Sequence, residues 1–242
     1  CPESVGKVLI TDGKSVGYCT GTLLDQNRVL TNSHCFHFRD GNRQWVSPQK
    51  LCESGTRIVF AATARRDHEQ FRCKKILKKS EINAAGYSPD YLIFEVDNMS
   101  SRASEMVSRE GLSSQEKYQI RKVTPVRRGL GRLQVATCQV IHGTVLVPES
   151  RSPQHHVHVL SGCDMTQGNS GASVVDSKGR VRGVLFKAIA ASQGSLNAFQ
   201  RDILEKALRL KVGFVLNAGC IDFAFSQAQP ATTKTCQMGN EK

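Results

Sequence analysis

The organisation of this chain follows from one stretch, Cys163-Asp164-Met165-Thr166-Gln167-Gly168-Asn169-Ser170-Gly171-Ala172. Ser170 sits among glycines, just before the apolar residues 173–175. Small neighbours let a carbonyl group approach a nucleophilic hydroxyl, and consecutive backbone N–H groups can hold an oxyanion. The same turn also fits a plain connection between two strands. A hydroxyl needs a base and a group that orients the base, so a histidine and a buried carboxylate should lie upstream.

The overall charge is strongly basic. The 242 residues include 33 Lys and Arg against 21 Asp and Glu, a net charge of +12. This balance suits an anionic surface or glycan, and equally a basic protein that is merely soluble. No aromatic platform interleaves with the charges, so specific binding to nucleic acid is not expected. Basic residues recur as doublets at 65–66, 74–75, 78–79, 121–122 and 127–128.

Nine cysteines lack the paired Cys-x-x-Cys pattern of zinc sites, which favours disulfides formed in an oxidising compartment. We therefore expect an exported protein, secreted or periplasmic, whose export signal has been removed. The odd count leaves one thiol over, and Cys1 is the simplest candidate. Acylation of Cys1, as in a bacterial lipoprotein, is a further hypothesis for anchoring.

Short apolar segments between turns predict an all-β fold. The expected strands of the first half are 5–10, 18–24, 28–32, 57–62, 72–77 and 91–96. Residues 97–122 are rich in Ser, Glu, Arg and Gln, which indicates a linker and a domain boundary near 115, giving domains 1–115 and 116–242. The expected strands of the second half are 134–141, 155–160, 173–175, 180–186 and 213–217.

One later segment departs from the strand pattern. Residues 195–211 carry apolar side chains at helical spacing and predict a short inserted helix. A polar tail follows at 226–242. The strand order favours three disulfides besides Cys19 with Cys35, namely Cys52 with Cys73, Cys138 with Cys163, and Cys220 with Cys236.

Two upstream residues meet the requirement set by Ser170. His34 ends an apolar strand beside Cys35, and a disulfide from Cys19 to Cys35 would fix the imidazole as a general base requires. Asp90 heads the apolar strand 91–96, where a buried carboxylate needs a partner such as a histidine N–H. Taken singly, His34 also fits a structural histidine, and Asp90 a residue that starts a turn.

Together these segments resemble the trypsin-like (chymotrypsin-fold) serine proteases, in motif order over about residues 5–217. The matching segments are 18–24, 29–35, 90–93 and 168–171. The resemblance implies two six-stranded antiparallel β-barrels with the active site in the cleft between them. It also implies a serine endopeptidase in which Ser170 attacks, His34 transfers the proton and Asp90 orients His34. The backbone N–H groups of Gly168 and Ser170 would form the oxyanion hole.

Asn169 departs from many members of that family. It stands where they carry an Asp that pairs with a new amino terminus after zymogen cleavage, and here the chain begins Cys1-Pro2-Glu3. An amide cannot make that ion pair. The motif resembles bacterial-type members with Gly-Asn-Ser-Gly and implies an active site independent of a buried terminal ammonium.

Substrate preference depends on two residues. Asp164 lies six residues before Ser170, where trypsin-like enzymes place the carboxylate that binds Arg or Lys, although related proteins with other specificities use an Asp there for structure. Lys187, on the expected opposite wall of the pocket, could neutralise Asp164 or attract an acidic residue.

We expect a monomer that acts on protein or peptide substrates without a cofactor. His155, His156 and His158 invite a metal interpretation, but no third ligand at suitable spacing is evident, and no metal site is expected. The alternative function is a catalytically weak family member that binds anionic glycans or surface polymers through its basic doublets.

Overall fold

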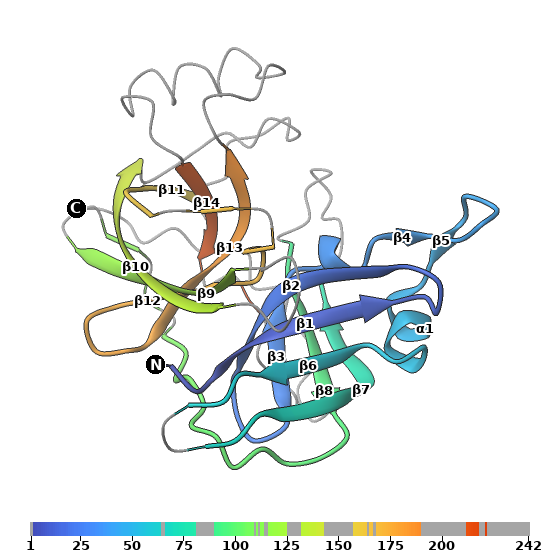
Figure 1. Cartoon of the computed structure of the whole chain (residues 1–242). Helices are drawn as coiled ribbons and strands as arrows, with labels where there is room; N and C mark the ends of the chain where they lie inside the picture. The colour runs from blue at the N-terminus through green and yellow to red at the C-terminus, as the bar shows by residue number, and fades with distance from the viewer. Residues whose placement is uncertain are drawn as a thin grey trace, which may run out of the picture.

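The computed structural model describes residues 2–63, 66–80, 90–108, 110, 112–113, 116–124, 132–142, 157–163, 165–166, 168–189, 212–217 and 221. Its strands form two closed six-stranded antiparallel barrels that lie side by side (Figure 1). The predicted all-β fold with two barrels is therefore confirmed. No helix among these residues is long and apolar enough to cross a membrane.

The first barrel has the strand order β1-β2-β3-β8-β7-β6. Its core is apolar and fully enclosed, with Val8, Leu23, Ile58 and Phe94 at zero exposure. Antiparallel neighbours place alternate side chains in this core, as the period of a half-buried strand requires. The strands are β1 (Val5–Thr11), β2 (Val16–Leu23), β3 (Arg28–Thr31), β6 (Arg57–Phe60), β7 (Glu69–Lys79) and β8 (Leu92–Val96).

The second barrel has the strand order β10-β11-β14-β13-β12-β9. Its core gathers Tyr118, Ile120, Leu160, Val174 and other buried residues. The strands are β9 (Lys117–Thr124), β10 (Arg132–His142), β11 (Val157–Ser161), β12 (Ser173–Val175), β13 (Val181–Ile189) and β14 (Val212–Asn217).

Strand β9 corrects the expected linker at 97–122. It pairs with both β10 and β12 and closes the second barrel. Tyr118 and Ile120 face the core, while Gln119 and Arg121 alternate with them. Those polar partners lower the apparent hydrophobicity of the segment, so composition alone reads it as a linker although its alternation is that of a strand.

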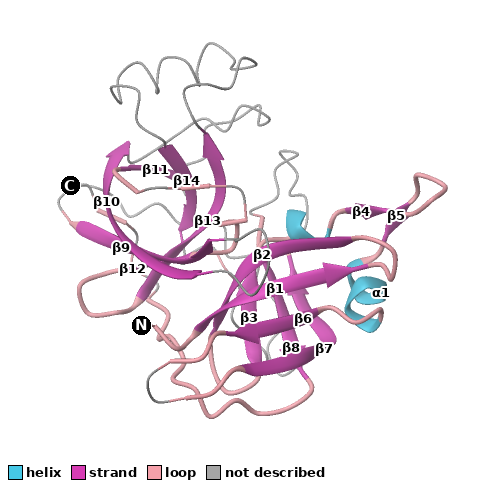
Figure 2. Cartoon of the chain, in the orientation of Figure 1, coloured by secondary structure: helices cyan, strands magenta, loops and turns pink. Residues whose placement is uncertain are grey.

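Three small elements were not expected from the sequence. Helix α1 (Pro48–Glu53) begins where the Ser47 hydroxyl accepts a hydrogen bond from the Lys50 N–H, with Pro48 in its first turn (Figure 2). The 3-10 turn η1 (His34–Phe36) carries His34 itself. Strands β4 (Phe38–Arg39) and β5 (Trp45–Val46) form a hairpin that projects from the first barrel (Figure 1).

Three of the four predicted disulfides are present, joining Cys19 to Cys35, Cys52 to Cys73 and Cys138 to Cys163. Such bonds are typical of extracellular or periplasmic proteins. The fourth pair, Cys220 with Cys236, lies outside the described residues, as do Cys1, the helix at 195–211 and the tail at 226–242.

An apolar cluster joins the two barrels. Leu30, Tyr91 and Ile93 of the first barrel pack with Val184 and Leu216 of the second, and Ile221 completes the cluster. Burial of this surface favours association of the barrels. Tyr91 and Leu30 lie within four residues of Asp90 and His34, so the interface holds those residues close to the second barrel.

Candidate active site

His34 and Asp90 meet through a short hydrogen bond. Nδ1 of His34 lies 2.7 Å from Oδ2 of Asp90, although the two residues are 56 positions apart. Strands β3 and β8, which precede and follow them, pair from Thr31 with Leu92 to Arg28 with Glu95. That pairing brings the ends of the two strands together. In the neutral imidazole, an Nδ1–H that donates to Asp90 leaves the Nε2 lone pair available to accept a proton.

The Asp90 carboxylate is fully engaged on the other oxygen as well. Oδ1 accepts from the Ser33 hydroxyl at 2.8 Å and from the His34 backbone N–H at 3.0 Å. Burial alone would raise the pKa of Asp90, but the hydrogen bonds from His34 and Ser33 outweigh it and hold the pKa below its usual value. The carboxylate is therefore ionised at neutral pH and fixed against rotation.

The backbone of Asp90 is strained. Its φ of 46° lies in the left-handed region, which residues with a Cβ seldom adopt. The Asn32 side chain, which is fully buried, donates through Nδ2 to the Asp90 carbonyl at 2.7 Å. This contact holds the strained peptide in place.

Ser170 is docked against the first barrel by backbone contacts. Its carbonyl accepts a hydrogen bond from the Thr20 N–H at 2.8 Å. The next residue, Gly171, lies so close that an added Cβ would be 2.1 Å from the Thr20 carbonyl oxygen and 2.5 Å from Oγ1 of Thr31. Thr20 follows Cys19, the disulfide partner of Cys35, and Thr31 lies three residues before His34. Ser170 is therefore held beside the segments that carry His34.

The turn before Ser170 is shaped by two residues. Gly168 has a φ of 90°, and its carbonyl accepts from the Thr20 hydroxyl at 3.1 Å. Asn169 is fully buried, accepts from the Thr166 N–H at 2.8 Å and donates to the Val123 carbonyl at 3.1 Å. Within the described part of the chain, the backbone N–H groups of Gly168 and Ser170 have no acceptor.

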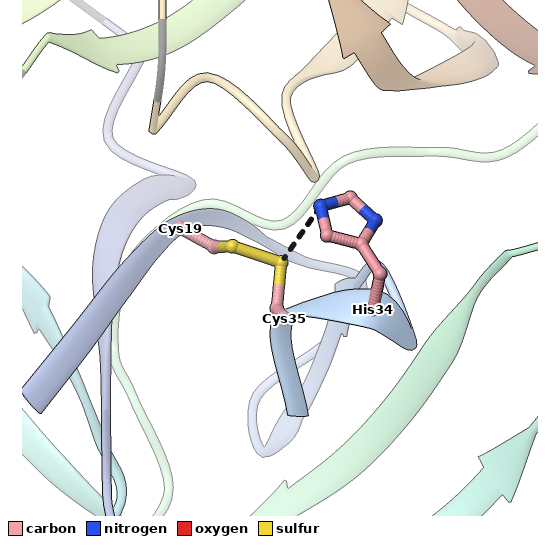
Figure 3. Close-up of side chains that lie close together, drawn as sticks. All are labelled: Cys19, His34 and Cys35. Atoms are coloured by element: carbon pink, nitrogen blue, oxygen red, sulfur yellow. Dashed lines mark hydrogen bonds between the residues drawn. A yellow bond between two sulfur atoms is a disulfide. The ribbon is translucent and has the colours of Figure 1, made fainter. Parts of the chain in front are cut away.

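Cys19, His34 and Cys35 form a compact group of potential metal ligands, with atoms within 4.8 Å of one another (Figure 3). The two sulfurs are bonded to each other, and Sγ of Cys35 lies 3.9 Å from Nε2 of His34. Sulfur in a disulfide is not a thiolate, which is the form that binds zinc. The group therefore acts as a covalent support beneath the imidazole.

The predicted specificity residues are only partly visible. Asp164 lies outside the described residues, and Lys187 is described through its backbone, which pairs with Phe214 between β13 and β14. Of the three histidines considered for metal binding, only His158 is described. It is 6% exposed and belongs to β11.

Three functional candidates escaped the sequence reasoning in part. Asn32 and Ser33 were quoted only as part of the motif around His34, and Asn169 only as a missing carboxylate. Each has a short polar side chain beside a motif residue, which is a signal that could have marked them. Their partners lie 46 to 58 residues away, so the contacts themselves could not be read from spacing.

The chain matches the family model described as trypsin-like peptidase domain over residues 19–184. It belongs to the trypsin-like peptidase family. Among curated protein sequences, no relative was found.

Solved structures with the same fold come from distant relatives. The active form of the Rv3671c protease of M. tuberculosis is 19% identical with a TM-score of 0.58, covering 90% of this chain and 77% of its own. The MamO protease domain of Magnetospirillum magneticum is 12% identical with a TM-score of 0.58, covering 90% and 93%. An inactivated protease paralogue of the scabies mite, SMIPP-S-D1, is 14% identical with a TM-score of 0.57, covering 90% and 88%.

Proposed function

We propose that this protein is a serine endopeptidase with Ser170 as nucleophile, His34 as general base and acid, and Asp90 as the group that orients His34. The observation that carries the proposal is the 2.7 Å hydrogen bond from His34 Nδ1 to an Asp90 carboxylate that is itself held on both oxygens. This bond selects the tautomer in which Nε2 can take a proton.

In the proposed reaction, Oγ of Ser170 attacks the carbonyl carbon of the scissile peptide bond and its proton passes to Nε2 of His34. The tetrahedral intermediate collapses when the C–N bond breaks and His34 returns that proton to the leaving amine. Water then attacks the acyl-enzyme ester, again giving a proton to His34. Ser170 recovers it as the acid product leaves, so no external reactant other than water is consumed.

The backbone N–H groups of Gly168 and Ser170 serve as the oxyanion hole in this proposal. Their lack of an acceptor among the described residues supports the role, because a developing negative charge needs donors that are already oriented and unoccupied. The left-handed φ of Gly168 shapes the turn between the two N–H groups.

We further propose that activity does not depend on an amino-terminal ion pair. Asn169 supports this because its side chain is satisfied by Thr166 and Val123, so the turn is ordered without a terminal ammonium. Adding residues before Cys1 should leave kcat nearly unchanged, as measured on a chromogenic peptide. A loss of several orders of magnitude would exclude this part of the proposal.

The proposed substrates are peptides or proteins with a basic residue before the cut, bound through Asp164. Peptides that vary this residue, assayed with the wild type and with Asp164→Asn, test the preference. A loss of the preference for Arg and Lys in the variant supports it. Equal use of all peptides by the wild type contradicts it and leaves open a role for Lys187 in attracting acidic residues.

The catalytic assignment is tested by a fluorophosphonate probe and a peptidase assay. We expect the probe to label wild-type protein at Ser170, and Ser170→Ala to lose both labelling and activity. Ser54→Ala, which changes an exposed hydroxyl at the end of α1, should keep both. Absence of labelling in folded wild-type protein favours the binding-module alternative, to which the inactivated mite paralogue gives a structural precedent.

The proposal also treats residues 1–115 and 116–242 as two domains that share the site, His34 and Asp90 coming from the first and Ser170 from the second. It places the monomeric enzyme outside the cytoplasm, where its disulfides are stable.

A further inference from the structure

Three consecutive residues converge on Asp90 from the end of β3. Asn32 donates to its carbonyl, Ser33 donates to Oδ1, and His34 bonds both carboxylate oxygens through its backbone N–H and Nδ1. One short segment of the first barrel therefore controls the backbone, the carboxylate and the imidazole together. The hydrogen bonds of Asn32 and Ser33 are not needed to form the barrel, whose strand pairs stop at Thr31.

The side chains that the second barrel packs near Asp90 are apolar. Tyr91, the next residue, lies in the cluster with Val184 and Leu216, and Phe186 packs against that cluster. None of these three residues of β13 and β14 has a side-chain hydrogen-bond donor. Among the described residues, the hydroxyl that donates to the Asp90 carboxylate is that of Ser33.

The orientation of the Ser33 hydroxyl is itself set by a neighbour. The Ser80 hydroxyl donates to Oγ of Ser33 at 3.2 Å, which occupies an acceptor position on that oxygen. The Ser33 proton is then directed to Oδ1 of Asp90 at 2.8 Å. Hydroxyl chains of this kind reinforce each bond, and a bond to a charged acceptor is stronger than one between neutral groups.

We propose that Ser33 is a positioning residue, which fixes the rotation of the Asp90 carboxylate so that Oδ2 faces Nδ1 of His34, while Asn32 holds the strained peptide of Asp90. Ser33 touches no reacting atom and acts through Asp90. The kinetic part of this inference rests on the proposed peptidase function, whereas the geometric part concerns His34 and Asp90 alone.

The test compares Ser33→Ala, which removes the hydroxyl, with Ser33→Thr, which keeps it. Proton NMR of the folded protein follows the Nδ1–H resonance of His34, a signal that depends on the bond to Asp90 and needs no substrate. Thr56→Val is the matched control, because Thr56 is a fully buried residue of the same barrel whose hydroxyl donates to the Leu51 carbonyl at 2.8 Å, away from Asp90.

We expect Ser33→Ala to move the Nδ1–H resonance upfield and to lower kcat about tenfold at nearly constant KM, an effect typical of a lost bond to a charged group. Ser33→Thr should restore both, and Thr56→Val should lower thermal stability alone. The inference is overturned if Ser33→Ala leaves the resonance unchanged, or if the Ala and Thr variants lose the signal equally. If the wild type proves inactive on peptides, the proposed function fails while the resonance still decides the role of Ser33.

Discussion

At the scale of single residues, the chemistry depends on how Asp90 is kept charged in a nearly enclosed position. An isolated carboxylate would gain protons on burial, because low polarity disfavours the charged form. Here donors from Ser33 and His34 reverse that tendency and lower the pKa of Asp90. The same bonds therefore contribute to stability and to the order of the site.

This coupling predicts a pH-dependent contribution from Asp90. Its folded-state pKa lies below the reference value of 3.8, so the contribution is fully present above that pH and is lost as the pH falls through the folded pKa. Asp90→Asn should lower the free energy of unfolding by about 1–3 kcal/mol at neutral pH and by less below about pH 4. Urea unfolding of both proteins across this range measures the difference, and a constant difference would contradict the prediction.

Gly171 is a second residue whose identity is dictated by its surroundings. Gly171→Ala would place a methyl group 2.1 Å from the Thr20 carbonyl oxygen at a φ of 85°. The strain costs about 1–3 kcal/mol and the overlap adds to it, because a backbone oxygen cannot turn aside as a side chain can. We expect lower thermal stability together with loss of peptidase activity as Ser170 is pushed away from the first barrel.

Gly13→Ala is the matched control for that variant. Gly13 has a similar φ of 89° but has no atom within 4 Å of an added Cβ. It should cost about 1–2 kcal/mol for the backbone conformation alone and leave activity intact. Equal effects of the two substitutions would show that Gly171 is needed for its backbone angle and not for close approach.

At the scale of elements, two disulfides of similar loop size have different neighbours. Cys19–Cys35 closes a separation of 16 residues between β2 and the turn η1 that carries His34, and Cys52–Cys73 closes 21 residues between α1 and β7. Loop-closure entropy treats them almost alike, at about 3 kcal/mol each. Only the first lies against the imidazole.

Replacing each cysteine pair by serine should therefore separate stability from activity. Both double variants should lose about 2–4 kcal/mol of unfolding free energy, as measured by urea denaturation. Only Cys19→Ser with Cys35→Ser should also lower kcat/KM strongly, because the turn at His34 loses its covalent support. The interpretation fails if the two variants are equally active.

At the scale of the whole molecule, the site is divided between two barrels and depends on their contact. Ile93 of β8 packs with Val184 and Leu216 of the second barrel, whereas Ile58 of β6 lies within the core of the first. Both isoleucines are fully buried. They provide a comparison between damage to the interface and damage to a single core.

Ile93→Ala and Ile58→Ala should each cost about 2–5 kcal/mol, through lost burial and the cavity that remains. Ile93→Ala should additionally reduce kcat/KM, since it loosens the alignment of Asp90 with the barrel that carries Ser170. Thermal unfolding and peptide hydrolysis below the melting temperature measure the two effects. A fully active Ile93→Ala variant would show that the polar contacts at Thr20 suffice to align the barrels.

The sequence by itself determined the all-β fold, most strand positions and three disulfides. Alternation of apolar side chains is a local property, and residues 163–175, 28–35 and 90–96 carry it beside chemically distinctive residues. Strand β9 was missed because Gln119 and Arg121 mask the alternation of Tyr118 and Ile120. The expected inserted helix lies outside the described residues and stays a prediction.

Only the tertiary structure decided how Asp90 is held, which atoms approach Gly171 and what satisfies Asn169. Asn32 and Ser33 reach Asp90 across 58 and 57 positions, and Asn169 reaches Val123 across 46. These contacts exist because β3 pairs with β8 and because the two barrels pack together. The direction of a short polar side chain is set by such long-range packing, and so it leaves no pattern in the local sequence.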